Sequence, residues 1–343
     1  MRRGARHATA AAVAVLALAG CSAEGPDGGT ADPGEGDLVE VPGVLVDGDS
    51  AALSPDGSRI AVPCDGELCV WATADGSLED RWDGGGVVAW SSTGLLATDR
   101  TDGGSVEVVL LDAGSGEEVG AATAHDADDV QDDPGGGLLD LAFAPDGETL
   151  AGVGADGVVR LWSVADPTDV VEVDPEGGRP VAVAFSPDGS TVAVASSDAP
   201  VAIHDTRSGD ELGSLPGPPQ GDVAWSPDGS SLATASFDLD ADAATTRWDA
   251  RSFEVEATLP RAGHHLAFDP ASDALVLSEK GETDVLVWSA DDVRTLAGAT
   301  DDPRAVMVSP DGARIYAVSP RDGVLAWDAA GGDVTTFDPP EED

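Results

Sequence analysis

The stretch VAVAFSPDGSTVAVAS, residues 181–196, decides the fold of this chain. It consists of two short, apolar, β-branched segments joined by Ser186-Pro187-Asp188-Gly189. Pro presets its own φ, Asp bonds neighbouring backbone groups and Gly accepts a positive φ, so the four residues predict a tight turn between two antiparallel strands. Further turns at Ser197-Asp198 and Arg207–Asp210 predict a four-stranded meander over residues 181–215.

The same phrase recurs along the chain. The clear copies are Ser54–Gly57, Ala144–Gly147, Ser186–Gly189, Ser226–Gly229 and Ser309–Gly312, and the worn copies are Ser91–Gly94 and Asp269-Pro270. A bulky residue precedes each turn: Leu53, Trp90, Phe143, Phe185, Trp225, Phe268 and Val308. Self-similarity at a period of about 40 residues predicts small sheets that must stack on one another, because one unit cannot bury both faces alone.

The end of the third strand lies at a nearly constant distance from the turn glycine. Fifteen residues separate Gly147 from Trp162, Gly189 from His204 and Gly312 from Trp327. Trp-Asp closes this strand at Trp248-Asp249 and Trp327-Asp328, and a Gly-His pair occurs at Gly263-His264. With these features the chain resembles the WD-repeat family of β-propellers, and the bacterial propellers that share the Ser-Pro-Asp-Gly turn, over residues 38–338.

The resemblance implies an all-β fold, a seven-bladed β-propeller of four-stranded antiparallel blades. Because most repeats lack the Gly-His dipeptide, the His/Asp/Trp network of that family cannot be general here. A closed ring of seven units would leave no long exposed sheet edge. Two segments could supply the outermost strand of the last blade, namely Leu38–Val41 or Val334–Phe337.

The N-terminus has the features of an export signal. Arg2, Arg3 and Arg6 precede an apolar run, Ala10–Ala19, that is too short to span a bilayer. Leu18-Ala19-Gly20-Cys21 resembles the bacterial lipobox, which implies a signal peptide over 1–20 and lipid attachment, such as palmitate, at Cys21; a plain secretory peptide is the alternative. Residues 21–37 then form a Gly/Pro-rich acidic tether, and 339–343 an acidic tail. The resulting localisation is extracytoplasmic, on the cell membrane.

Two further cysteines, Cys64 and Cys69, flank Asp65–Leu68 at the ends of two predicted paired strands. In an exported chain this even number favours a disulfide across the hairpin. A metal pair and reduced core cysteines are the alternatives. Zinc sites need further Cys or His ligands, and the first repeat has none.

The formal net charge is −48, from 65 acidic and 17 basic residues. Nucleic acid is therefore excluded as a partner, because its binding depends on basic side chains that neutralise phosphates. Solubility and adaptation to salt are a sufficient explanation of the acidity, and we expect a monomer.

The two largest insertions in the repeats fall on the face of the ring opposite the Ser-Pro-Asp-Gly turns. Loops held by a rigid scaffold often bind partners, so we interpret this variable acidic face as the binding surface for another protein or an envelope component. The candidate residues lie between the second and third repeats: Asp126, Asp128, Asp129, Asp132 and Asp133.

The second insertion carries Asp238, Asp240 and Asp242, which alternate as at the start of a calcium loop. Ala243 stands where such a loop needs Gly, and Asp249 where it needs Glu, so a solvated acidic loop is the favoured alternative. Apart from this calcium site, no cofactor is predicted.

No nucleophile elbow, phosphate loop or His-rich metal motif occurs in the sequence. His204 is expected to pack where other repeats have Trp, His264 to be structural, and His125 to lie in a solvated loop. Asp140 and Asp222 are the only carboxylates that approach the centre of the ring. The sequence therefore favours a non-catalytic binding scaffold over the alternative, a lactonase-, quinone-dehydrogenase- or hydrolase-type propeller enzyme with a site at the central channel.

Overall fold

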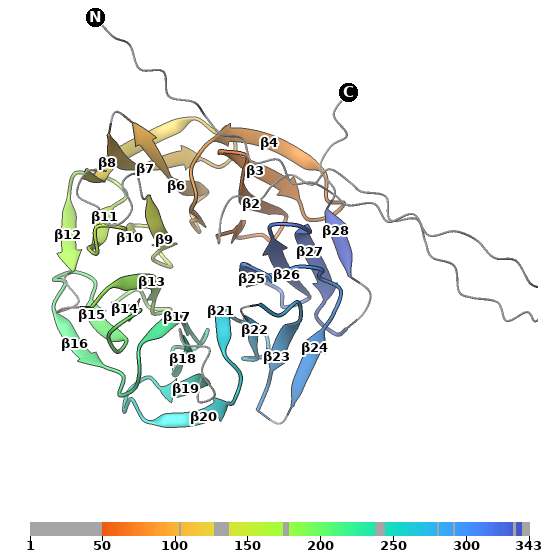
Figure 1. Ribbon diagram of the computed structural model, residues 1–343. Helices are drawn as coiled ribbons and strands as arrows, with labels where there is room; N and C mark the ends of the chain where they lie inside the picture. Colours follow the sequence, from red (N-terminus) through yellow and green to blue (C-terminus); the bar gives the residue numbers. More distant parts are fainter. Residues whose placement is uncertain are drawn as a thin grey trace, which may run out of the picture. The chain divides into compact units, whose positions relative to one another are not determined.

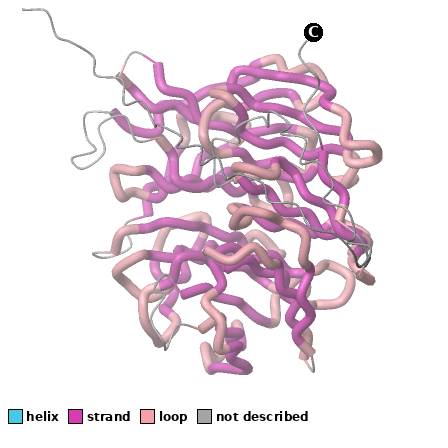
Figure 2. Tube along the Cα trace, turned by 45° about the vertical axis from the view of Figure 1, so that its right-hand side comes forward, coloured by secondary structure: helices cyan, strands magenta, loops and turns pink. Residues whose placement is uncertain are grey.

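The computed structural model describes residues 50–102, 104–126, 137–173, 178–236, 244–279, 281–290, 292–331 and 334–337. Within these ranges the chain forms seven four-stranded antiparallel sheets and no helix (Figures 1 and 2). The sheets follow one another around a ring, with the first strand of each nearest the centre (Figure 1). The predicted seven-bladed β-propeller is therefore confirmed.

Each blade is a meander of consecutive strands. Blades 1 to 3 consist of β1 (Ala52–Leu53), β2 (Arg59–Cys64), β3 (Glu67–Ala72) and β4 (Leu78–Asp83); β5 (Val88–Trp90), β6 (Leu95–Asp102), β7 (Ser105–Asp112) and β8 (Glu118–Asp126); and β9 (Leu138–Phe143), β10 (Thr149–Gly154), β11 (Val159–Ser163) and β12 (Val170–Val173).

Blades 4 and 5 consist of β13 (Pro180–Phe185), β14 (Thr191–Ser196), β15 (Ala202–Asp205) and β16 (Glu211–Ser214); and β17 (Gln220–Trp225), β18 (Ser231–Ser236), β19 (Thr245–Asp249) and β20 (Val255–Leu259). Blades 6 and 7 consist of β21 (Gly263–Phe268), β22 (Leu275–Glu279), β23 (Val285–Trp288) and β24 (Val293–Leu296); and β25 (Ala305–Val308), β26 (Arg314–Ser319), β27 (Gly323–Asp328) and β28 (Thr335–Phe337).

The last blade takes its outermost strand from its own hairpin. Residues Thr335–Phe337 pair with β27 as β28, which selects the second of the two predicted closures. The other candidate, Leu38–Val41, lies outside the described residues. Every blade in the structure is thus built from one continuous stretch of chain.

The Ser-Pro-Asp-Gly turns form as predicted. In blade 4, Asp188 Oδ1 accepts hydrogen bonds from the Ser186 hydroxyl at 2.7 Å and the Ser190 amide at 3.0 Å. Gly189 has φ +70°, a conformation that favours glycine. Two aligned donors on one carboxylate oxygen explain why Asp occupies this position.

Side chains of neighbouring blades interlock in a repeated way. In six blades the residue directly before the bulky residue of the first strand is Ala, opposite an Ala or, in blade 6, Val276 on the second strand. The bulky residue before the turn of the next blade packs into the space that these small residues leave. Trp225, for example, packs on Ala184 and Ala193 and donates its indole N–H to the Ala184 carbonyl at 3.2 Å.

The interface between blades 7 and 1 reverses this arrangement. Blade 7 carries Met307 opposite Tyr316 where the other blades have Ala and Ala or Val. Blade 1 offers the smaller Leu53 where most blades have an aromatic residue, and all three side chains join one cluster. Tyr316 is 2% exposed, so the aromatic ring that fills this interface comes from blade 7. A cavity of about 310 Å³ lies beside it, lined by Tyr316, Arg314, Thr73 and the turns at Pro55 and Pro310.

Candidate functional site

Most of the predicted loop and anchor residues lie outside the described residues. These are Cys21, Asp128, Asp129, Asp132, Asp133, Asp238, Asp240 and Asp242. Asp126 is described: it is the last residue of β8, it is exposed, and its carboxylate accepts a hydrogen bond from the Ser105 hydroxyl at 3.1 Å. The insertion between blades 2 and 3 therefore begins after Asp126 rather than at Ala124.

The prediction for His125 was wrong. Strand β8 extends through this residue, and the His125 side chain is 4% exposed. Its Nδ1 lies 3.2 Å from the Asp126 carbonyl oxygen and its Nε2 lies 3.4 Å from that of Gly137. His125 is thus packed at the start of the inter-blade crossing and not in a solvated loop. His204 is buried as expected, with Nδ1 3.1 Å from the Gly209 carbonyl.

Cys64 and Cys69 lie on neighbouring strands, β2 and β3, and both side chains are buried. The structure joins them in a disulfide with a Cα–Cα separation of 5.9 Å. The geometry agrees with the predicted hairpin pair.

A polar feature that sequence reasoning did not resolve surrounds the axis of the ring. Ser50, Asp140 and Asp222 occupy the same position in blades 1, 3 and 5, three residues before the bulky residue. Each accepts a hydrogen bond from a main-chain amide of the next blade: Val88 donates to Ser50 Oγ at 3.0 Å, Val183 to Asp140 Oδ2 at 2.8 Å, and Leu266 to Asp222 Oδ2 at 2.8 Å. We call these three contacts the axial bridges.

The second oxygen of each carboxylate is also used. Asp140 Oδ1 accepts the amide of Leu141, and Asp222 Oδ1 accepts that of Val223, both at 2.8 Å. A β-bulge precedes both aspartates, with Leu139 and Gly221 as the extra residues opposite the second strand. Bulges redirect side chains, and here they accompany carboxylates that reach the neighbouring blade.

The environment of this pair disfavours charge. Both carboxyls are half-buried on the inner wall of the ring. Their amide donors favour the ionised form, but the loss of hydration on burial outweighs them. Burial raises the pKa of Asp140 to about 7. Burial, together with repulsion from Asp140, raises the pKa of Asp222 to about 8.

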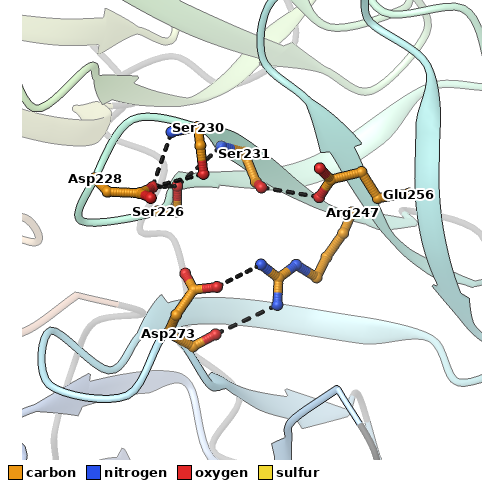
Figure 3. A network of polar contacts seen from close by, with 7 residues as sticks. All are labelled: Ser226, Asp228, Ser230, Ser231, Arg247, Glu256 and Asp273. Atoms are coloured by element: carbon orange, nitrogen blue, oxygen red, sulfur yellow. Dashed lines mark hydrogen bonds and ion pairs between the residues drawn. The ribbon is translucent and has the colours of Figure 1, made fainter.

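The opposite situation holds for the aspartates of the turns. In Figure 3, Asp228 Oδ1 accepts hydrogen bonds from Ser230 and Ser226, and the Ser230 hydroxyl is the closest at 2.7 Å. These contacts, led by the Ser230 hydroxyl, lower the pKa of Asp228 to about 2. The pKa is lowered in the same way at the other turn aspartates: Asp56, Asp75, Asp112, Asp166, Asp188, Asp205, Asp249 and Asp311. These aspartates thus have a structural role in turn formation.

Figure 3 also shows how blades 5 and 6 are joined near this turn. Arg247 of β19 donates to the Asp273 carboxylate at 2.7 Å and to its carbonyl at 3.3 Å. The same guanidinium lies 5.4 Å from the centroid of the Phe268 ring. Arg59 stacks similarly on Trp90 between blades 1 and 2, at 5.0 Å. These cations are used to join blades.

On the face opposite the turns, two arginines are engaged by carboxylates. Arg100 contacts Glu107 and Glu118 at 2.9 Å, and Arg261 contacts Glu279 at 2.6 Å. Among the described residues of this face, five exposed acids form no ion pair: Asp65, Asp102, Asp126, Asp198 and Glu282. Two exposed arginines there, Arg179 and Arg321, also form none. In the described part of this face, the unpaired surface charge is therefore mainly negative.

Neither a metal centre nor a membrane helix is found in what the structure describes. No three His, Cys, Asp or Glu side chains come together there as metal ligands. No helix long and apolar enough to cross a membrane occurs in the same residues.

Seven four-stranded blades arranged in a ring define the class of this protein as a β-propeller. Two segments, residues 130–163 and 209–240, match the family model described as WD domain, G-beta repeat. They include the turn and the third strand of blade 3, and the first turn and second strand of blade 5. No curated protein matches the chain.

Proposed function

We propose that this protein is a non-catalytic interaction scaffold, a WD-repeat-type propeller held at the outside of the cell membrane by a lipid on Cys21. The propeller fold with WD segments carries the proposal, since such rings present rigid surfaces to partners. The charged start, apolar run and Leu18–Cys21 quartet support export and anchoring. A buried cysteine pair in bonding contact is also expected of an exported chain.

The face opposite the turns is the proposed binding surface, and its partner is another protein or an envelope component with a basic surface. Two observations support this choice. Turn aspartates on the other face already accept several hydrogen bonds each, whereas Asp65, Asp102 and Glu282 are exposed and form no ion pair within 4 Å among the described residues. Asp126, which ends β8 on this face, is followed in the sequence by the long acidic insertion. Such a contact would be weakened by salt.

A catalytic site at the axis of the ring has less support than a binding surface. Asp140 and Asp222 each use both oxygens for main-chain amides, which supports a structural role for these two carboxylates. Their engagement favours a binding scaffold over a propeller enzyme with its site at the axis.

Anchoring is tested by replacing Cys21. Wild-type protein should partition with membranes and incorporate labelled fatty acid, and Cys21→Ser should do neither. Wild-type protein that stays unlabelled and is released in soluble form would contradict the lipid anchor.

Partner binding is tested by crosslinking on intact cells and identification of captured proteins. We expect a reproducible partner whose capture falls when Asp128, Asp129, Asp132 and Asp133 are changed together to Asn. The matched control neutralises four exposed acids near the turns, Glu117, Glu148, Asp210 and Glu254, as Gln or Asn. Capture that survives the first set, or falls equally with both, would overturn the assignment of the binding face.

A further inference from the structure

Two interfaces of the ring depend on carboxylates that are poorly placed to hold a charge. Asp140 joins blades 3 and 4, and Asp222 joins blades 5 and 6. In both, one carboxylate oxygen accepts the amide of the following residue and the other accepts an amide of the next blade. Ser50 joins blades 1 and 2 from the equivalent position with a hydroxyl that does not titrate. The three axial bridges thus contain two ionisable members and one neutral one.

The surroundings of the pair offer little compensation. Strands β5, β10, β13, β14 and β18 pack against β9 and β17 and carry no titratable side chain. Asp99, Arg100 and Asp102 lie on β6, where the Arg100 guanidinium contacts Glu107 and Glu118. His264 and His265 lie on β21. The Asp99 carboxylate is itself buried and accepts the amides of Val87 and Leu138.

We propose that Asp140 and Asp222 are proton-binding bridges, which exchange inter-blade hydrogen bonds for protons near neutral pH and so make two interfaces of the ring responsive to acidity. An ionised carboxylate accepts two amide N–H groups at once, one from each blade. A proton on one oxygen turns that oxygen into a donor, so the bridge it made to an amide weakens. The proton also removes a half-buried charge and the repulsion between the two carboxyls.

Protonation of the pair changes the global stability and the local protection of the bridged amides in opposite directions. Because the pKa of each group is raised in the folded state, folded protein binds more protons than unfolded protein between about pH 4 and about pH 8. Global stability contributed by the pair is therefore gained as pH falls through this window and lost as pH rises. Local protection of the bridged amides changes the other way, because protonation weakens their hydrogen bonds.

The direct test is a carboxyl ¹³C titration of wild-type protein labelled at Asp, with Asp140→Asn and Asp222→Asn used for assignment. We expect two coupled resonances that titrate close to neutral pH, well above the ordinary aspartate range. Resonances that titrate near pH 4 would overturn the proposal.

The second test compares bridges within one protein by hydrogen exchange. After correction for intrinsic rates, the amides of Val183 and Leu266 should lose protection on acidification from about pH 9 to about pH 5, whereas the amide of Val88, bound to Ser50, should not. Parallel behaviour of all three amides would refute a proton-linked bridge.

Variants separate titration from mere packing. The melting temperature of Asp140→Asn/Asp222→Asn should depend less on pH across that window than the melting temperature of wild type. Ser50→Ala removes an axial bridge without a titratable group, so it should lower the melting temperature at every pH and leave the slope unchanged. An unaltered slope in the double variant would count against the proposal, and the wild-type titration remains decisive if that variant does not fold.

Discussion

The reversed packing between blades 7 and 1 can be tested by exchanging the two sides. Tyr316→Ala restores the small residue found at this position in five other blades, yet Leu53 is too small to fill the space. Tyr316 is 2% exposed, and large-to-small changes of buried aromatic residues cost about 3–5 kcal/mol. Because the neighbouring 310 Å³ cavity lets the site relax or admit water, we expect the lower end, about 3 kcal/mol.

Leu53→Phe supplies the missing half of the exchange. In the wild-type background the added ring must compete with Tyr316, so this change should destabilise by about 1–3 kcal/mol. In the Tyr316→Ala background the same ring enters a space that the change has widened, with Met307 still on its other side, and should stabilise. The sign of the Leu53→Phe effect therefore depends on residue 316.

The assay is urea unfolding of the four proteins of this cycle, followed by tryptophan fluorescence, since Trp71 belongs to the same cluster. Contacting residues typically show coupling of about 0.5–3 kcal/mol. Tyr316→Phe is the control, because it keeps the ring and removes only the hydroxyl. Additive effects, with Leu53→Phe equally destabilising in both backgrounds, would refute the account of this interface.

Other features of the structure give sharp expectations. Purified protein should yield a Cys64–Cys69 crosslinked peptide in non-reducing mass spectrometry, and Cys64→Ser/Cys69→Ser should lose about 2 kcal/mol from the short loop, whereas recovery of free thiols alone would exclude the bond. Gly85→Ala should destabilise by about 1–3 kcal/mol because a Cβ there would overlap Asp99, while Gly86→Ala, with no atom near its Cβ, should be almost silent in the same urea titration. Folded-state pKa values of Asp56 and Asp228 near 2 mean that their stabilisation is present above about pH 4 and is lost as pH falls toward 2; Asp228→Asn should therefore flatten the acid limb of a melting-temperature profile, and an identical limb would argue against this contribution.

The repeated turn was sufficient to predict the architecture. Pro, Asp and Gly at Pro187–Gly189 dictate one backbone conformation through local contacts, so the strands on either side could be placed from sequence. The reversed interface also left a signal, because Leu53 departs from the aromatic pattern and Met307 and Tyr316 depart from Ala. What the sequence lacked was the pairing of those departures across the ring.

The axial bridges were not predictable in the same way. Asp140 and Asp222 were recognised as the carboxylates nearest the centre, but their partners are main-chain amides of another blade, which have no side-chain signature. Their direction also depends on bulges at Leu139 and Gly221, and an extra residue in a strand is decided by tertiary packing. The prediction for His125 was wrong for a related reason. Pairing with β7 extends β8 through His125 and Asp126, past the point where the sequence changes from apolar to acidic residues.

In the residues that the structure describes, each blade is one continuous stretch of chain, so a circular permutation need not change the order of the blades around the ring. A circular permutant could begin in any connection between the last strand of one blade and the first strand of the next without dividing a sheet. Its new ends would fall between complete folding units. The interface between blades 7 and 1, which relies on Met307, Tyr316 and Leu53 rather than on a shared strand, would then become an internal junction like the other six.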